Sequence, residues 1–275
     1  CRYVPCEGPG CDTRSFAGTF PYLLRGTPGS IRFSLEKELS AYTHCRSAEL
    51  GGRHQTTWIR INNVTVFQSG GLTEFYAKFL DDPRQKPAIA RLSGIIRETD
   101  PDPDDRARIA VSLVQSIPYE KADLSGPIKL PYDVLYTGSG DCDEKSLLLA
   151  ALLRELGYNV SLLRFDDQKH MAVGIRVPTG YDYNHTGYAF IETTNPAIIS
   201  FNSLSDMFGV AGNPVIIPVS DGREFGTIAE EYSDAENLET LITTSKRNGI
   251  LSHDEAETLL ALKNRYGLNI TVTLV

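Results

Sequence analysis

The sequence predicts an α+β protein: one buried helix packs against an antiparallel sheet, between an N-terminal disulfide-rich region and a C-terminal helical hairpin. Two observations predict the core of this arrangement. Residues 143–156 contain no helix breaker and are apolar nearly all round, as a central helix is. Three segments with strand character, 159–165, 171–177 and 188–193, follow closely. A helix layered on such strands forms an α+β core.

The chain before this core is predicted to be mixed. Residues 1–30 are rich in Cys, Gly and Pro, which predicts a loop-rich segment. A short helix is expected over 34–43, and residues 58–67 alternate apolar and polar side chains, as a half-buried strand does. Two further helices are expected over 73–80 and 86–98.

Residues 100–105 read Asp-Pro-Asp-Pro-Asp-Asp, and such a cluster of carboxylates suggests calcium. An EF-hand loop needs Gly at its sixth position and Glu at its twelfth, where this chain has Asp105 and Val111. Pro fits the first turn of a helix, and carboxylates favour the positive end of its dipole. We therefore expect a helix over 105–115 rather than a metal loop.

The end of the chain predicts two more helices. Residues 227–245 are polar and helical in pattern, with Gly249 as the stop signal. Ser252 and Glu255 form a capping-box pattern that starts a helix running to residue 266. We divide the chain into an N-terminal region (1–100), a core (101–226) and a C-terminal hairpin (227–275).

Charge and hydropathy exclude two classes of partner. With 27 Lys and Arg against 35 Asp and Glu, the formal net charge is −8. Binding to a phosphate backbone needs clustered cations, so we expect no nucleic-acid partner. The most apolar run, 147–153, is far shorter than the roughly 18 residues of a membrane span, so we expect no transmembrane segment.

The cysteines predict a compartment. Cys1, Cys6, Cys11 and Cys45 lie in the first part of the chain and Cys142 stands alone. Zinc sites usually show closely spaced pairs, which are absent, so we expect two disulfides, of three possible connectivities, and no metal. Disulfides imply an extracellular or cell-surface location, with a signal peptide removed before Cys1. A lipid anchor on Cys1 is the alternative.

Cys142 is the candidate nucleophile. It follows Gly-Ser-Gly-Asp and falls at the N-terminus of the predicted buried helix. The free N–H groups and the dipole of a helix N-terminus stabilise a thiolate, and the thiolate is the reactive form of cysteine. The alternative is a small buried apolar residue, which free cysteines often are.

His170 and Glu192 are the candidate partners of this thiol. His170 precedes the apolar strand Met-Ala-Val-Gly-Ile, so a rigid element holds its ring at an edge. An imidazole there can take the thiol proton and return it to a leaving amine. Glu192 ends the next strand, where a carboxylate bonded to the imidazole would fix its tautomer. Taken singly, each residue is equally well explained as an ordinary surface side chain.

Three segments resemble the signature blocks of the transglutaminase-like superfamily of papain-like cysteine enzymes: GSGDCDEKSLLLAALLRELGY, KHMAVGI and YAFIETT. The likeness extends upstream through 108–119 and 132–135. It is greatest to transglutaminase-like proteins of archaeal, often methanogen, surfaces. In this superfamily the Cys opens the central helix, the His heads a strand, and an Asp or Glu ends the following strand.

The resemblance implies a catalytic triad of Cys142, His170 and Glu192, without a cofactor. Glu192 departs from the Asp that is often the third member. Gln115 is the candidate side-chain donor to the oxyanion, beside the Cys142 N–H. The implied activity is acyl transfer through a thioester, which we expect to cleave peptide or isopeptide bonds of a protein substrate. The alternatives are a cross-linking transglutaminase and a non-enzymatic surface binding module.

Overall fold

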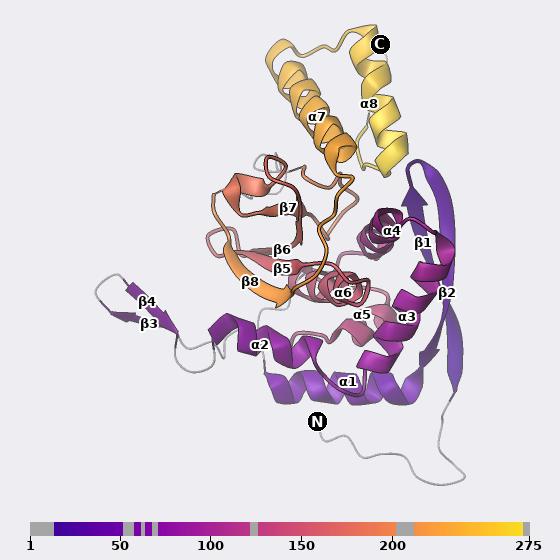
Figure 1. Cartoon of the computed structure of the whole chain (residues 1–275), viewed down its shortest axis with the longest axis vertical. Helices are drawn as coiled ribbons and strands as arrows, with labels where there is room; N and C mark the ends of the chain where they lie inside the picture. The colour runs from indigo at the N-terminus through magenta and orange to yellow at the C-terminus, as the bar shows by residue number, and fades with distance from the viewer. Residues whose placement is uncertain are drawn as a thin grey trace.

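The computed structural model describes residues 14–51, 58–61, 64–67, 71–121, 126–201 and 212–271 of the chain. At its centre, helix α6 (Cys142–Glu155) packs against a four-stranded antiparallel sheet (Figure 1). The α+β architecture predicted from the sequence is therefore confirmed.

Helix α6 is central because most of its side chains are apolar and fully buried, among them Leu147, Leu149 and Leu152. Its start is fixed by a capping box, in which Asp141 caps the helix and Glu144 bonds back to the Asp141 N–H. Gly157, with a φ of 90°, follows its last turn and lets the chain reverse into the sheet.

The sheet has the strand order β7-β6-β5-β8. Strand β5 (Val160–Phe165) pairs with β6 (His170–Arg176) on one side and with β8 (Val215–Ser220) on the other. Strand β7 (Tyr188–Ile191) completes the sheet beside β6. Strands β5, β6 and β7 confirm the predicted segments to within a few residues, whereas β8 is not anticipated by the sequence analysis.

Alternation along these strands divides the core into two clusters. Side chains such as Leu162, Val173 and Ile191 belong to the main cluster around α6. Phe165, Ala172 and Phe190 belong to a second cluster, which they share with the C-terminal helices. The residues of the main cluster extend in sequence from Phe20 to Ile228, so most of the chain contributes to one hydrophobic core. The domain boundaries at 100 and 226 stay predictions.

Five further helices surround the core: α1 (Lys37–Leu50), α2 (Gly71–Leu80), α3 (Lys86–Thr99), α4 (Pro103–Ser116) and α5 (Pro131–Thr137). Helices α2, α3 and α4 confirm the predicted segments. Asp102 caps α4 by accepting from the N–H groups of Asp104 and Asp105, as expected of the acidic segment. Helix α5 lies in a stretch for which the sequence analysis predicts no helix or strand.

The first part of the described chain is a β-hairpin, which corrects the loop-rich segment expected for residues 1–30 from Ser15 onward, whereas residues 1–13 lie outside the described residues. Strands β1 (Ser15–Leu24) and β2 (Thr27–Glu36) pair along their full lengths. The turn holds Arg25 and Gly26 at φ values of 49° and 83°, as a two-residue type I′ turn requires. Residues 34–36 belong to β2, so the helix predicted over 34–43 begins only at Lys37.

The strand predicted over 58–67 is instead two short strands, β3 (Trp58–Ile61) and β4 (Val64–Phe67), paired antiparallel. Apolar–polar alternation is the same in one long strand and in a tight hairpin, so the pattern could not separate them.

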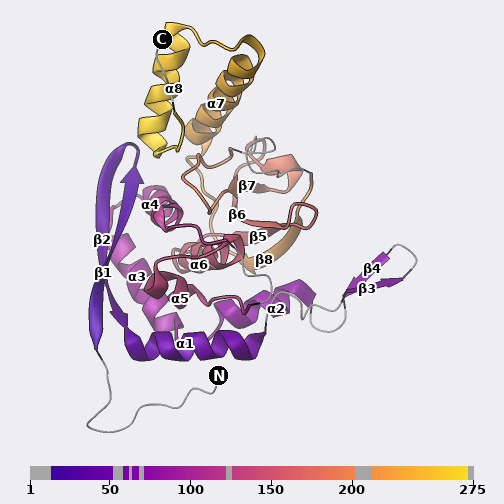
Figure 2. The same ribbon diagram turned by 180° about the vertical axis from the view of Figure 1, so that it is seen from behind.

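The predicted C-terminal hairpin is present as α7 (Ala229–Asn248) and α8 (His253–Tyr266). The Ser252–Glu255 capping box forms as expected, and Gly249 ends α7 in a left-handed conformation. Both views place α8 beside the tip of the β1–β2 hairpin (Figures 1 and 2).

Cys45 on α1 is disulfide-bonded, and Cys142 is the free cysteine among the described residues. Cys1, Cys6 and Cys11 lie outside the described residues, so the disulfide-rich N-terminal region is not supported beyond Cys45 and stays a prediction. Within the described ranges, no helix combines the length and the apolar character that crossing a membrane demands.

A buried ion pair joins the hairpin to the core. Arg108 on α4 donates to both carboxylate oxygens of Glu231 on α7, at 2.5 and 3.0 Å, and both side chains are buried. Arg108 also donates to Asp105 (2.8 Å) and to the Thr227 carbonyl (2.8 Å). Such a bidentate pair, supported by further hydrogen bonds, fixes the orientation of α7 on α4.

The substitution Glu231→Gln should lower the free energy of unfolding by about 3 kcal/mol, because Asp105 is then the only carboxylate that pairs with the buried Arg108 among the described residues. Urea denaturation measures this loss. Glu239→Gln, on the exposed face of α7, is the control and should change the value by less than about 1 kcal/mol. Equal effects of the two substitutions would show that the ion pair does not hold the hairpin.

Candidate active site

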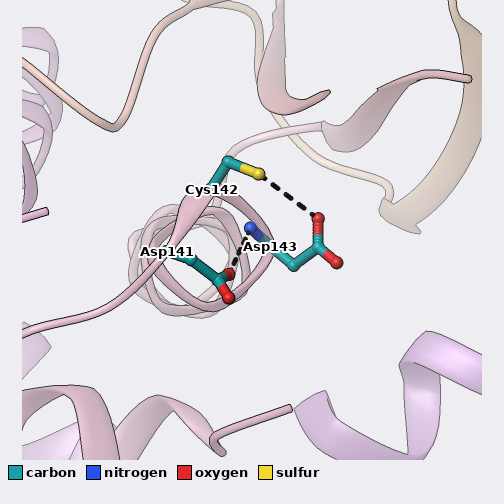
Figure 3. A group of neighbouring side chains, drawn as sticks. All are labelled: Asp141, Cys142 and Asp143. Carbon is teal, nitrogen blue, oxygen red and sulfur yellow. Dashed lines mark hydrogen bonds between the residues drawn. The ribbon is translucent and has the colours of Figure 1, made fainter. Parts of the chain in front are cut away.

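Cys142 is the first residue of α6, as the sequence predicts. Asp141 precedes it and accepts hydrogen bonds from the backbone N–H groups of Asp143 and Glu144, at 3.0 and 3.1 Å (Figure 3). The Cys142 side chain is only 8% exposed and packs with the main core cluster. Cys142 is thus largely buried, with a small opening to solvent, at the helix start predicted for it.

The surroundings of the sulfur are acidic. Figure 3 shows the Cys142 Sγ directed toward the Asp143 carboxylate, 3.6 Å from Oδ1. A neighbouring carboxylate opposes ionisation of a thiol, whereas the helix dipole favours it. A cationic partner is therefore needed to hold the sulfur as a thiolate.

Asp141, Cys142 and Asp143 also form the one group among the described residues whose ligand atoms, within 4.8 Å of one another, could hold a metal. Asp141 already bonds two N–H groups as the helix cap, however, which explains its position without an ion. We assign the cluster to helix capping, and the expectation of no metal stays a prediction.

His170 and Glu192 meet directly, although they are 22 residues apart. His170 Nε2 lies 2.9 Å from Glu192 Oε2, and the carboxylate is 1% exposed. The other oxygen, Oε1, accepts from the N–H groups of Thr193 (2.9 Å) and Thr194 (2.7 Å) and from the Thr194 hydroxyl (2.6 Å). Both oxygens of this buried carboxylate are therefore bonded.

These bonds determine the charge of Glu192. Burial on its own raises the pKa of a carboxyl group. For Glu192 the hydrogen bond and the charge of His170, with the bonds from Thr194, outweigh burial, and its pKa lies below the ordinary value. Glu192 is consequently an anion at neutral pH.

The first turns of α6 contact the strand ends that carry this pair. Ser146 follows Cys142 by one turn on the same face of the helix. Its hydroxyl donates to the Met171 carbonyl and lies 3.2 Å from the Thr193 hydroxyl. Met171 and Thr193 are the chain neighbours of the histidine and the glutamate. Cys142 thus lies one helical turn from a residue that contacts the chain neighbours of the pair, and contact between sulfur and imidazole stays a prediction.

Gln115, the candidate oxyanion donor, has a different role. Its side-chain amide donates to the carbonyls of Glu192 (2.9 Å) and Ala197 (3.1 Å), which uses both of its hydrogens. This expectation is therefore wrong: Gln115 fixes the loop after β7. The Cys142 N–H stays the predicted oxyanion donor.

Lys145 is a site residue that the sequence analysis did not identify. It is fully buried, and its Nζ donates to the carbonyls of Ile117 (2.5 Å), Thr194 (3.2 Å) and Gln115 (3.4 Å). Burial lowers its pKa to about 8, although the charge of Glu192 acts in the opposite direction. No local signal marks this residue, because Lys145 lies between Glu144 and Ser146 at the polar start of the helix, and only the fold supplies the partners that a buried ammonium group needs.

The pKa of Lys145 predicts a pH dependence of stability. A lysine with a pKa of about 8 when folded and 10.5 when unfolded binds fewer protons in the folded state between those values. Its contribution to stability therefore rises as pH increases from 8 to 10.5. The free energy of unfolding of the wild-type chain, measured relative to that of Lys145→Met by urea denaturation, should rise by about 2 to 3 kcal/mol between pH 7 and pH 10. A difference that stays constant with pH would show that Lys145 titrates normally.

Part of the chain matches a known protein family. Residues 90–163 match the model of the transglutaminase-like superfamily. This stretch runs from within α3 to within β5, so it includes Cys142 and ends before His170 and Glu192. A search of curated proteins finds no match. The family match and the α+β fold together support the transglutaminase-like superfamily, and likeness to archaeal surface proteins stays a prediction.

Proposed function

We propose that the chain is a cysteine-dependent acyl-transfer enzyme that cleaves peptide or isopeptide bonds through a thioester. Cys142 acts as nucleophile, His170 as general base and acid, and Glu192 as the group that orients the imidazole. The buried His170–Glu192 hydrogen bond, beside the helix that begins with Cys142, carries this proposal. A thiol nucleophile needs a neighbouring base that is held in place by a third group, and here a buried carboxylate holds a largely buried imidazole.

The hydrogen bond assigns the roles of the two ring nitrogens. Because Glu192 is an anion, His170 Nε2 carries a proton and donates it to Oε2. In the neutral ring, Nδ1 is then the nitrogen with a free lone pair. Nδ1 takes the Cys142 thiol proton, and the resulting imidazolium is stabilised by Glu192. This ion pair compensates for the carboxylate of Asp143 beside the sulfur.

The reaction then follows in two halves. The Cys142 thiolate attacks the amide carbonyl, and the tetrahedral oxyanion is stabilised by the Cys142 N–H. When it collapses, the C–N bond breaks, Nδ1–H protonates the leaving amine and a thioester remains. Water, losing a proton to Nδ1, attacks the thioester and releases the acid, and the proton returns to the thiolate sulfur. An amine in place of water would give transamidation.

Substitution Cys142→Ala should abolish turnover while changing the free energy of unfolding little, because it removes one sulfur atom. The assay incubates the chain with a glutamine-containing peptide library and with isopeptide-linked peptides, with and without a primary amine, and reads products by mass. Fragments that depend on Cys142 identify hydrolysis, and incorporated amine identifies a transglutaminase. A binding module would instead leave the peptides unchanged. Its Cys142 would react with iodoacetamide only after denaturation.

Glu192→Gln should lower kcat by about 10³- to 10⁴-fold with KM nearly unchanged, by analogy with tautomer loss in other triads. The three donors around Oε1 would select the amide oxygen, so the NH₂ group would face His170 Nε2 and move the ring proton to Nδ1. Glu257→Gln is the matched control, because Glu257 forms an exposed pair with His253 (3.3 Å). Equal rates for both variants would remove Glu192 from the mechanism.

A further inference from the structure

A pocket lies between α1 and α5. Figure 1 shows these helices on the side of the molecule away from the C-terminal hairpin. Its volume is about 280 Å³, near the lower end for small-molecule sites. None of its lining residues belongs to the candidate triad. The pocket therefore needs an explanation of its own.

Asp133 provides the buried polar group of this pocket. Its side chain is 3% exposed, and Oδ1 accepts from the Thr43 hydroxyl at 2.5 Å. The other oxygen, Oδ2, is buried and has no hydrogen-bond partner among the described residues. Burying an acceptor without a partner is unfavourable, so a donor that enters the pocket and reaches Oδ2 is stabilised there.

Basic side chains line the same pocket. Lys37 and His44 come from α1, and Lys129 from the segment before α5. Lys129 Nζ bonds Glu120 at 2.6 Å, yet an ammonium group has three donors and can bind a second anion. Burial raises the pKa of Asp133 to about 6, with Thr43, His44, Ser40 and Lys129 acting in the opposite direction, so the carboxylate is ionised at neutral pH.

This distribution of charge selects the ligand. An isolated cation would bond Asp133 but be repelled by the two lysines, and an isolated anion would leave Oδ2 without a donor. A molecule with an ammonium group and a carboxylate satisfies both. The Ala41 and Tyr136 side chains complete the wall and leave room for a small apolar substituent.

We propose that this pocket binds a small zwitterion of the α-amino-acid class, with its ammonium group on Asp133 Oδ2 and its carboxylate on the lysine and histidine side chains. Lys129 extends the site toward α6: its backbone N–H donates to Glu144 Oε1 at 2.9 Å, and its Nζ reaches the Ser139 carbonyl at 3.3 Å. Bound ligand therefore contacts a side chain that also holds the segment preceding Cys142.

Isothermal titration calorimetry on the full chain at pH 7 tests the proposal with glycine, alanine, serine and leucine. Ethylamine and propionate serve as probes for the two halves of the ligand. We expect at least one amino acid to bind at least tenfold more tightly than either half. Binding by none of the four, or equal binding of ethylamine or propionate, would overturn the proposal.

Two variants locate the ligand. Asp133→Asn keeps an acceptor for Thr43 but removes the charge, and the double substitution Lys37→Gln with His44→Gln changes exposed side chains only. Each should weaken amino-acid binding at least tenfold, whereas Lys86→Gln on α3, outside the pocket, should not. If Asp133→Asn fails to fold, the double variant alone tests the proposal. Unchanged amino-acid affinity of the double variant would exclude this pocket as the binding site. The measurement is independent of catalytic activity.

Discussion

The buried carboxylate of Glu192 is the constraint on which the site depends. An anion in this position is tolerable only if both of its oxygens are bonded, and His170 and Thr194 supply most of those bonds. The backbone around it is fixed in turn, because Gln115 holds the Glu192 carbonyl and Lys145 holds that of Thr194. Helix α4 and the thiol-bearing helix α6 thereby both hold the end of β7.

The same helix start combines two opposing electrostatic effects. Asp141 and Glu144 make α6 begin at Cys142, which brings the sulfur to the positive end of the dipole. The carboxylates of Asp141 and Asp143 also add negative charge close to that sulfur. In the proposed mechanism, a thiol in this position becomes a nucleophile only through a proton acceptor. Such an arrangement would restrict reactivity to the geometry in which the imidazole is engaged.

Much of the core could be predicted from the sequence because its signals are local. The apolar run of α6, the alternation in β5 and β6, and the Ser252 capping box each depend on neighbouring residues. The β1–β2 hairpin was missed because its Gly and Pro residues resemble loop composition, and α5 because seven residues are too few to show a period. The roles of Gln115 and Lys145 depend on carbonyls distant in sequence, which no local pattern contains. His170 and Glu192 were found because motif order, rather than periodicity, identified them.

The Arg108–Glu231 pair has a consequence for how the C-terminal helices relate to the site. Arg108 and Gln115 lie seven residues apart on α4, about two turns or roughly 10 Å, and therefore on the same face. One end of this face anchors α7, and the other positions the peptide unit of Glu192. A chain shortened before α7 would thus lose more than an appendage: the buried Arg108 guanidinium would keep only Asp105 as a carboxylate partner, on the same helix whose other end holds the Glu192 carbonyl.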